Sequence, residues 1–522
     1  MSDETKDQDE QPGEPEALSE TADRVMLEKL EALRAAGLDP YAEVRFDRTH
    51  NAAEIIEGYD ALEGQNVRVA GRILTKRVMG KAGFADLHDQ SGKIQLYFKR
   101  DDVKYARGEG APRPDGIEDC AAGRGLSAYE LYKKLDLGDI IGAEGFVFKT
   151  KTGEISIHVE SFTLLCKILR PLPEKWHGLT DVEARYRHRY VDLAINREVR
   201  DRFLTLCKAK SEIRRFLESR DFVEVETPLL HEIAGGATAE PFVTHYNALD
   251  QDMYMRIAIE LHLKRLIVGG MERVFEMGRV FRNEGTSVKH NPEFTMLELY
   301  WAYADYGDVM ELTESLVAHV AKNVFGSYLR SFGGIELDFT PPFKRMKFAD
   351  AMRTCAGVEL AQVRTLDAVV AKAKSIGLEL PEKRTYEKVL DEIFKELVEP
   401  NLIQPTFILD YPVELTLLAK RRPDDPRLVY RFELFVAGFE IANSFSEAND
   451  PLDQRARMEE QVEEARAAGE EFRAVDEDFL AALEYGMPPN GGLGIGIDRL
   501  CMLLSGQQSI REVLLFPQLR KK

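Results

Sequence analysis

Short runs of alternating apolar and polar residues occupy most of the chain between residues 61 and 168, and glycine-containing turns separate them. In the run VRVAGRIL, the apolar side chains of Val67, Val69 and Ile73 share one face. A strand points successive side chains to opposite faces, so runs of this kind predict the strands of a small all-β barrel.

The outer face of the predicted barrel carries rings, an arginine and an amide. Arg72, Phe84, Gln95 and Tyr97 all fall on the face opposite to the apolar one. Rings stack on nucleobases, arginines meet phosphates and an amide reads a base edge, so this face suits single-stranded nucleic acid. The pattern alone leaves a second interpretation open, in which these are scattered surface residues of an ordinary barrel.

The rest of the pattern predicts four further regions. Residues 1–24 are acidic with little to bury, which predicts a disordered acidic tail. Residues 25–60 form an N-terminal helical segment, and residues 169–199 form a proline-punctuated linker. In residues 200–522 helices and strands alternate, so the predicted fold class of the whole chain is α+β.

Individual elements follow from the spacing of apolar residues. Apolar residues at 26, 30 and 33 predict a helix over Val25–Ala36, and a second amphipathic helix covers Arg200–Arg220. That helix leads into the strand FVEVETPLL, which Pro228 ends. A helical section is expected near Leu366–Leu397, and the Gly- and Pro-rich stretch 106–127 is expected to be an inserted loop without an assigned role.

The net charge of −20 is unevenly spread, because two acidic runs, residues 1–24 and Asp453–Asp478, carry most of it. The remainder is close enough to neutral to hold local basic faces for nucleic acid. The five cysteines show no spacing typical of zinc, which favours a reducing compartment. No apolar run approaches the about 18 residues of a membrane span. We therefore expect a cytoplasmic protein without a membrane segment.

Candidate chemistry first appears in the stretch FRNEGTSVKHNPEFTMLELY. Period 2 places Arg282 and Glu284 on one side of a first strand, and Phe294, Met296, Glu298 and Tyr300 on one side of a second. Charges on a buried face are costly unless an opposite charge meets them. This favours a ligand whose anionic group meets Arg282 and whose cation meets Glu298. A surface hairpin whose charges pair with each other is the alternative.

A second candidate hairpin is ELFVAGFEIANSFSEAND. If Ala437 and Gly438 form the turn, Glu433 opposes Ala442, and Glu433 and Glu440 share a face. Two close carboxylates suit magnesium, whereas two solvated glutamates are the alternative. The same simple hairpin places three polar or aromatic residues on the opposite face, and they reach the site only if the strand bulges. Those residues are Asn443, Phe445 and Glu447.

The third candidate is GGLGIGIDRL, which lacks the strand, spacing and later acid of a dinucleotide fingerprint. Gly492, Gly494 and Gly496 fall on one strand face, and a face without side chains is a slot for something flat. Arg499 follows and can stack on an aromatic base. Glycines that only permit tight strand packing are the alternative.

Taken in order, these segments resemble the motifs of the class II aminoacyl-tRNA synthetases, and specifically those of the lysyl-tRNA synthetases. The strand ending at Pro228 matches the first motif, FRNEG with KHNPEF the second, and GLGIGIDRL the third. Longer strings that match the lysyl type are LRPLPEKWHGL, RYRHRYVDL, AGGATAEPF, HNPEFTMLELYWAYADY and SFSEANDP. The similarity runs from about residue 60 to the last residue. It implies an OB-fold anticodon-binding barrel at 61–168, followed by a catalytic antiparallel sheet flanked by helices at 200–522.

The resemblance also implies ligands for individual residues. The ATP-binding residues would be Arg282, Glu284, His290, Asn291, Phe294, Glu433 and Arg499, of which Arg282, Glu284 and Arg499 are catalytic. The lysine-binding residues would be Gly236, Glu260, Arg282, Glu298, Tyr300, Asn443, Phe445 and Glu447. Mg²⁺ would be held by Glu433 and Glu440. The anticodon of tRNA(Lys) would meet Arg72, Phe84 and Gln95.

The implied reaction joins L-lysine to tRNA(Lys) through a lysyl-adenylate, in a homodimer formed through the strand ending at Pro228 and its preceding helix. An aspartyl-type synthetase would need cations where Glu298 and Glu447 stand. A ligase that lysylates an elongation factor lacks the barrel, and a non-catalytic RNA-binding paralogue has no reason to keep the site. This chain departs from the family pattern at Ile259, where proline is common, at His262, where an aromatic is usual, and at Ser444, where glycine is frequent.

Overall fold

The computed structural model describes residues 20–106, 127–173, 181–233, 235–237, 239–285, 287–380, 384–467 and 475–520. The first 19 residues of the predicted acidic tail and the inserted loop between 107 and 126 lie outside the described residues. The chain divides into two compact units, Met1–Ile195 and Asn196–Lys522. We call them unit 1 and unit 2.

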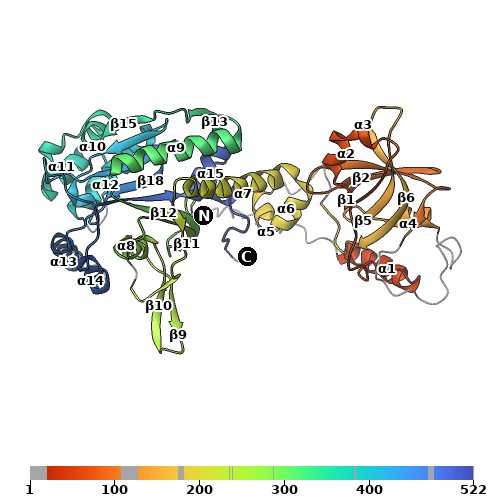
Figure 1. Ribbon diagram of the computed structural model, residues 1–522, viewed down its shortest axis with the longest axis horizontal. Coiled ribbons are helices and arrows are strands. Elements are labelled where there is room, and N and C mark those ends of the chain that lie inside the picture. Colours follow the sequence, from red (N-terminus) through yellow and green to blue (C-terminus); the bar gives the residue numbers. More distant parts are fainter. Residues whose placement is uncertain are drawn as a thin grey trace, which may run out of the picture. The chain divides into compact units, whose positions relative to one another are not determined.

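Unit 1 contains the predicted barrel (Figure 1). Its strands are β1 (Asn66–Met79), β2 (Ala82–His88), β3 (Lys93–Lys99), β4 (Lys104–Tyr105), β5 (Ile140–Lys149) and β6 (Ile155–Cys166). They pair in the order β3-β2-β1-β5-β6-β4, and a further pairing between β3 and β6 closes the barrel. Buried and half-buried residues alternate strictly along β2, as the sequence predicts. The apolar face fills the barrel interior, with Val67, Val69 and Ile73 fully buried.

Helices cover the barrel and extend beyond it. They are α1 (Glu20–Ala35), α2 (Ala52–Glu57), α3 (Tyr59–Leu62), α4 (Ala128–Lys134), α5 (Val182–Arg187) and α6 (Arg189–Ile195). Helix α1 begins at Glu20, before the predicted start at Val25. Helices α5 and α6 lie inside the predicted linker. The spacing of apolar residues does not reveal these helices. Arg189 and Asp192, which form a buried ion pair at 2.7 Å, occupy buried positions that are usually apolar.

Unit 2 is built on an eight-stranded sheet of order β15-β16-β17-β18-β19-β12-β11-β7. Its strands are β7 (Val223–Glu224), β11 (Arg273–Phe281), β12 (Glu293–Ala302), β15 (Lys344–Lys347), β16 (Thr406–Leu409), β17 (Arg431–Val436), β18 (Phe439–Ser446) and β19 (Asn490–Gly496). All neighbours are antiparallel except β15 with β16 and β7 with β11. This agrees with the implied antiparallel catalytic sheet flanked by helices.

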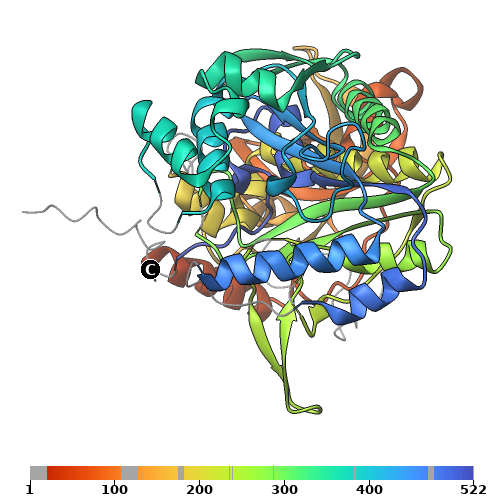
Figure 2. The same ribbon diagram turned by 90° about the vertical axis from the view of Figure 1, so that its left-hand side faces the viewer.

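The helices of unit 2 flank this sheet (Figures 1 and 2). They are α7 (Arg197–Glu218), α8 (Glu260–Val268), α9 (Tyr306–Phe325), α10 (Phe348–Ala351), α11 (Leu366–Ser375), α12 (Tyr386–Leu397), α13 (Pro451–Ala467), α14 (Glu477–Glu484) and α15 (Ile497–Ser505). A Cβ atom on Gly491 would lie 2.6 Å from Val309, so α9 packs on one side of β19. The predicted helical section near 366–397 corresponds to α11 and α12. None of the described helices is long and apolar enough to cross a membrane.

A smaller sheet of β8 (Leu230–His231), β9 (Val243–Tyr246) and β10 (Gln251–Met255) projects from the body of unit 2 (Figures 1 and 2). A hairpin of β13 (Leu329–Phe332) and β14 (Ile335–Asp338) completes the strands. The predicted strand FVEVETPLL is broken into two short pieces: Val223 and Glu224 join the eight-stranded sheet as β7, and Leu230 begins β8 of the smaller sheet. The Thr227 N–H donates to the Glu276 carboxylate at 3.0 Å and not to a neighbouring strand, and Pro228 has no N–H to donate.

Candidate active site

Strands β11 and β12 form the predicted hairpin, with Phe281 opposite Glu293. The alternation predicted that Arg282 and Glu284 lie on the first strand. They instead follow it, because β11 ends at Phe281. The chain turns away there, and the Asn283 N–H donates to the carbonyl of Glu240 at 2.7 Å instead of to β12. Arg282 is therefore held at the mouth of the hairpin, where its guanidinium lies 5.2 Å from the centre of the Phe294 ring.

Strand β12 follows the predicted alternation. Leu297 and Leu299 are fully buried in the core, while Glu298 and Tyr300 face the other side and line a cleft. Both of these cleft residues are almost inaccessible to solvent, at 4% and 3% exposure. A carboxylate buried to this extent needs a cationic partner.

The second hairpin contains the bulge on which its prediction depended. Ala437 and Gly438 form the turn, both with positive φ, and Phe435 pairs with Glu440. The register then shifts, so that Glu433 opposes Asn443 and not Ala442. The extra residue in β18 turns Glu440 and Asn443 to the same side. Glu440, Asn443 and Phe445 consequently all line the cleft.

Strand β19 lies between β12 and β18 and supplies a floor of glycines. Gly494 pairs with Glu298 on one side and Asn443 on the other, and Gly492 pairs with Tyr300 and Phe445. A Cβ on Gly492 would overlap the Glu447 carboxylate and the Tyr300 ring, so neighbouring side chains occupy that space. At Gly496 the nearest atom would be Arg499 Cδ at 3.7 Å. The expected flat slot therefore exists only at the Gly496 end.

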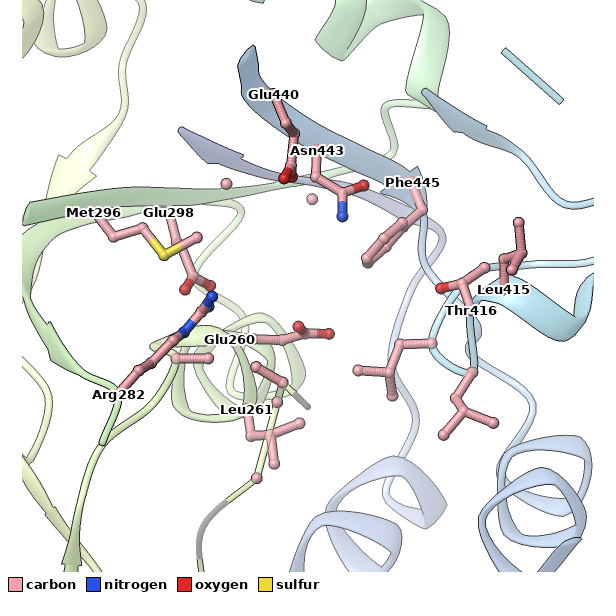
Figure 3. A pocket seen from close by; sticks show the side chains of 18 of the residues that line it. Glu260, Leu261, Arg282, Met296, Glu298, Leu415, Thr416, Glu440, Asn443 and Phe445 are labelled. Atoms are coloured by element: carbon pink, nitrogen blue, oxygen red, sulfur yellow. The ribbon is translucent and has the colours of Figure 1, made fainter. Parts of the chain in front are cut away.

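The cleft has a volume of about 1600 Å³. Figure 3 shows Glu260, Arg282 and Glu298 on one side, Asn443 and Phe445 on another, and Leu415 and Thr416 facing Glu260 across the cavity. The predicted residues that line it are Gly236, Glu260, Arg282, Glu284, His290, Asn291, Phe294, Glu298, Tyr300, Glu440, Asn443, Phe445 and Arg499. Among the described residues of the predicted set, Glu433 and Glu447 lie behind the cleft wall, at 9% and 1% exposure.

The cleft has an acidic end. Burial, reinforced by the negative charge of Glu260, raises the pKa of Glu298 to about 8. The backbone N–H of Ile259 donates to Glu298 Oε1 at 2.9 Å, which favours the ionised form. A proline at position 259 could not make this bond, because it has no N–H.

Lys264 is a residue at this end that the sequence analysis missed. Its ammonium lies 2.5 Å from Glu260 Oε1 and 2.6 Å from Glu447 Oε2. Helical spacing could have found it, because residues four apart share a helix face. Near it, the ring of His262 lies 4.6 Å from that of His231, and His262 Nδ1 has no hydrogen-bond partner among the residues that the structure describes.

Arg431 was also missed. Its guanidinium lies 2.5 Å from Glu433 Oε1 and donates to Asn443 Oδ1 at 3.1 Å, and the Tyr411 hydroxyl donates to Glu433 Oε2 at 2.6 Å. Both Glu433 oxygens thus accept one hydrogen bond, and each keeps a lone pair. Period 2 could have pointed to Arg431, which stands two residues before Glu433 on the same strand.

The other end of the cleft is cationic and more open. Arg499 donates to the Glu440 carbonyl at 3.0 Å, and its second amino group lies 3.2 Å from His290 Nε2. Burial and the charge of Arg499 lower the pKa of His290, so its ring is neutral and Nε2 accepts the bond. With Arg282 and Phe294, these groups offer two guanidinium ions and an aromatic face to an anionic, planar ligand.

The barrel face in unit 1 holds the other predicted residues. The Phe84 and Tyr97 rings lie 5.1 Å apart, and the Gln95 amide oxygen accepts from Ser156 Oγ at 2.9 Å. Arg72 is partly engaged, because it donates to the Gly138 carbonyl at 2.7 Å. Exposed Arg77 pairs directly with Phe84 across β1 and β2, and the sequence analysis missed it because a bulge between Ile73 and Thr75 changes the register.

Comparison with known proteins identifies both units. Residues 181–520 match the family of tRNA synthetases class II (D, K and N), and residues 67–165 match an OB-fold nucleic acid binding domain. The fold and the cleft are thus those of a class II tRNA synthetase.

Individual relatives narrow this class. The chain is 54% identical to the lysine–tRNA ligase of Moorella thermoacetica, over 95% of this chain and 97% of the relative. It is 51% identical to that of Carboxydothermus hydrogenoformans, over 96% and 98%, and 50% identical to that of Bacillus subtilis, over 96% and 97%. The chain belongs to the lysine–tRNA ligase family, and the aspartyl-type and non-catalytic alternatives find no support.

Proposed function

We propose that unit 2 activates L-lysine with ATP and transfers it to tRNA(Lys), and that the barrel of unit 1 binds the anticodon. One observation carries this proposal. Two carboxylates, Glu260 and Glu298, line one end of the cleft with Glu447 buried directly behind its wall, while His290 and Arg499 line the other end and Arg282 lies within reach of both. A ligand with two amino groups fits the first end, and a nucleotide fits the second.

Lysine binds with its α-amino group at Gly236 and Glu260 and its carboxylate at Arg282. Its side chain passes Asn443 and Phe445, and its ε-ammonium meets Glu298, Tyr300 and Glu447. Support comes from burial, since a desolvated ammonium interacts strongly with a desolvated carboxylate when their geometry is complementary. Aspartate would place a further negative charge beside these carboxylates, and repulsion excludes it.

ATP binds with its adenine between Phe294 and Arg499, and with Glu284, His290 and Asn291 around the nucleotide. The lysine carboxylate attacks the α-phosphate, giving lysyl-adenylate and pyrophosphate, and the acyl group then passes to the 3′-terminal adenosine of the tRNA. Catalysis needs no side-chain nucleophile. Arg282 contacts both reactants, so it orients them and neutralises charge that develops on the α-phosphate.

Magnesium is the proposed cofactor, with Glu433 and Glu440 as its protein ligands. Each Glu433 oxygen keeps a lone pair, and Glu440 is half-exposed in the cleft. Among the described residues no group of three His, Cys, Asp or Glu side chains could hold a metal, so the site relies on phosphate oxygens and water for its other ligands. Bound there, the ion would screen the charge of the phosphates.

On the barrel, Phe84 stacks on the central uridine of the anticodon and Gln95 reads its edge, with Arg72 and Arg77 near the backbone. We place the anticodon domain at residues 61–168 and the catalytic domain at 200–522. The acidic tail at 1–24, the helical segment at 25–60 and the connecting segment at 169–199 carry no catalytic residue in this proposal.

We further propose a cytoplasmic homodimer, formed through Pro228, its strand and the preceding helix α7. Supporting it, Leu229, Leu230 and Val243 are 46%, 44% and 59% exposed beside this strand, and such clustered apolar exposure marks an interaction surface. Sedimentation velocity should give a dimer for the wild type and a monomer for Leu230→Asp. A monomeric wild type at micromolar concentration would rule this out.

Lysine-dependent exchange of pyrophosphate into ATP, without tRNA, tests the proposed activity. We expect exchange with lysine and none with aspartate. Absence of exchange with lysine, or equal exchange with both amino acids, would refute the proposal.

A further inference from the structure

A buried lysine side chain joins two of the three carboxylates at the closed end of the cleft. Lys264 lies one helical turn after Glu260 in α8, and its side chain is 1% exposed. Glu447, the residue that follows β18, contacts the same ammonium. A desolvated ammonium is costly by itself, so this position is stable only because two carboxylates meet it.

Each of these carboxylates keeps an oxygen for another partner. Lys264 bonds Glu260 through Oε1, and Glu260 also lines the cleft. Glu447 uses Oε2, and its Oε1 has no hydrogen-bond partner in the described part of the chain. That free oxygen lies over Gly492 beside the Tyr300 ring, in the space that a Cβ on Gly492 would take. Gly492 and Tyr300 both line the cleft, so this oxygen is an unpaired buried acceptor at the cleft wall, and a ligand group that reaches the wall would satisfy it.

When all of its carboxylates are ionised, this end of the cleft has charges that balance only with a ligand. Glu260, Glu298 and Glu447 then carry three negative charges, Glu298 having released its proton as the ligand binds, while Lys264 and Arg282 carry two positive ones. Arg256, another buried cation nearby, already pairs with Glu276 at 2.5 Å. A ligand with two ammonium groups and one carboxylate carries one positive charge, which makes the loaded site neutral.

We propose that Lys264 is a positioning residue, an internal ammonium that holds Glu260 and Glu447 at the correct spacing, so that each receives one amino group of the substrate. The inference rests on the proposed function and extends it, because Lys264 acts through these two carboxylates and touches neither ATP nor the reacting atoms.

The pKa of the Lys264 ammonium depends on all of the charged groups that surround it. Burial lowers the pKa of Lys264, but Glu260 and Glu447 outweigh it and raise the pKa above its ordinary value. Burial raises the pKa of Glu447, and Lys264 opposes that rise. The remaining ionisable groups around the site are Glu298 and Tyr300 on β12, with Arg282 and Arg256 beside Glu298. Loss of Lys264 therefore removes the charge that opposes this rise, so Glu447 protonates at a higher pH.

The test is the full-length Lys264→Met variant in pyrophosphate exchange, measured from pH 6 to pH 9. We expect the KM for lysine to rise at least about 30-fold at pH 7, because two carboxylates lose their shared cation, while the KM for ATP changes less than about threefold. The acid limb of kcat/KM for lysine should move to higher pH by about one unit or more. An unmoved acid limb, or equal increases in both KM values, would overturn the inference.

Arg265→Met is the matched control, since Arg265 is the next residue of α8 but pairs with Asp478, at 2.8 Å. It should leave both KM values and the acid limb in place, and a shift equal to that of Lys264→Met would show that any charge on α8 has this effect and overturn the inference.

A second variant covers the case in which Lys264→Met does not fold. Lys264→Met combined with Glu447→Gln removes one charge of each sign, and it is compared with Glu447→Gln alone. The double variant should show a higher KM for lysine than Glu447→Gln alone, because Glu260 has lost the cation that holds it in place, and equal KM values would contradict the proposal. A wild type without lysine-dependent exchange would refute the proposed function and this inference together, whereas an active wild type with unchanged variants would refute only the inference.

Discussion

The cleft of unit 2 and the barrel face of unit 1 offer opposite kinds of surface to their ligands. The cleft presents carboxylates that are almost completely buried, such as Glu298 at 4% exposure. The barrel presents half-exposed rings and amides, such as Phe84 and Gln95. Buried charge discriminates strongly between small ligands, because an unmatched charge cannot return to water. Exposed stacking adds affinity in smaller steps and tolerates more variation.

The largest expected effect is that of Glu298→Gln, which removes one of the two carboxylates that meet the ε-ammonium of lysine. Lysine binding should weaken by about 2 to 4 kcal/mol, or roughly 30- to 1000-fold in KM, while the KM for ATP stays within about threefold. Glu284→Gln, the same change at the nucleotide end, is the control and should affect ATP more than lysine. Equal losses for both substrates in Glu298→Gln would erase the distinction between the two ends.

Two glycine substitutions on β19 should each add a methyl group at one end of the cleft, and so affect the KM for lysine and the KM for ATP separately. Gly492→Ala forces Glu447 and Tyr300 aside, and overpacking of this kind costs about 1 to 3 kcal/mol, which should appear in the KM for lysine. Gly496→Ala meets only an ordinary contact with Arg499 and narrows the nucleotide slot, so it should raise the KM for ATP. Steady-state exchange kinetics measure both values, and the reverse pattern would show that the ends are misassigned.

On the barrel, Phe84→Ala should act on tRNA alone. Loss of one base stack weakens binding by about 1 to 3 kcal/mol, seen as a higher KM for tRNA in aminoacylation. Exchange of pyrophosphate without tRNA should be unchanged. A fall in exchange would show that the barrel contributes to adenylate formation, and the contrast between the two surfaces would no longer hold.

The smallest effect is the pH dependence of lysine binding. Glu298 must be ionised to hold an ammonium, and its pKa in the free protein is raised to about 8. Lysine affinity should therefore fall as pH drops below 8, by up to about tenfold per unit, while a proton is released on binding. Calorimetry in buffers of different ionisation enthalpy measures that proton. No release at pH 7 would mean that Glu298 is already ionised in the free protein.

Alternation predicted much of this architecture. It gave the inward and outward faces of the barrel strands and the cleft face of β12, because period 2 holds wherever a strand is regular. It failed where regularity ends: Arg282 follows the last residue of β11, and the bulge near Ala442 re-aims Asn443. Both depend on backbone partners elsewhere in the fold, which local sequence does not reveal.

The family resemblance supplied most candidate site residues but not their internal partners. Lys264 and Arg431 each neutralise a predicted carboxylate, and each stands at a helical or strand spacing that places it on the same face. Ile259 first stood out only as a departure from proline, and its N–H proves to bond Glu298. Whether a buried charge is satisfied by the protein or by a ligand is decided by three-dimensional contacts.

The central claim is that the closed end of the cleft selects its substrate by an ammonium group. Pyrophosphate exchange with norleucine, which has the lysine side chain without the ε-ammonium, tests it most directly. The account predicts that kcat/KM for norleucine lies about 10⁴-fold below that for lysine, because Glu298 would be left buried without a cation and Glu447 would keep only Lys264. Norleucine within about tenfold of lysine would contradict it.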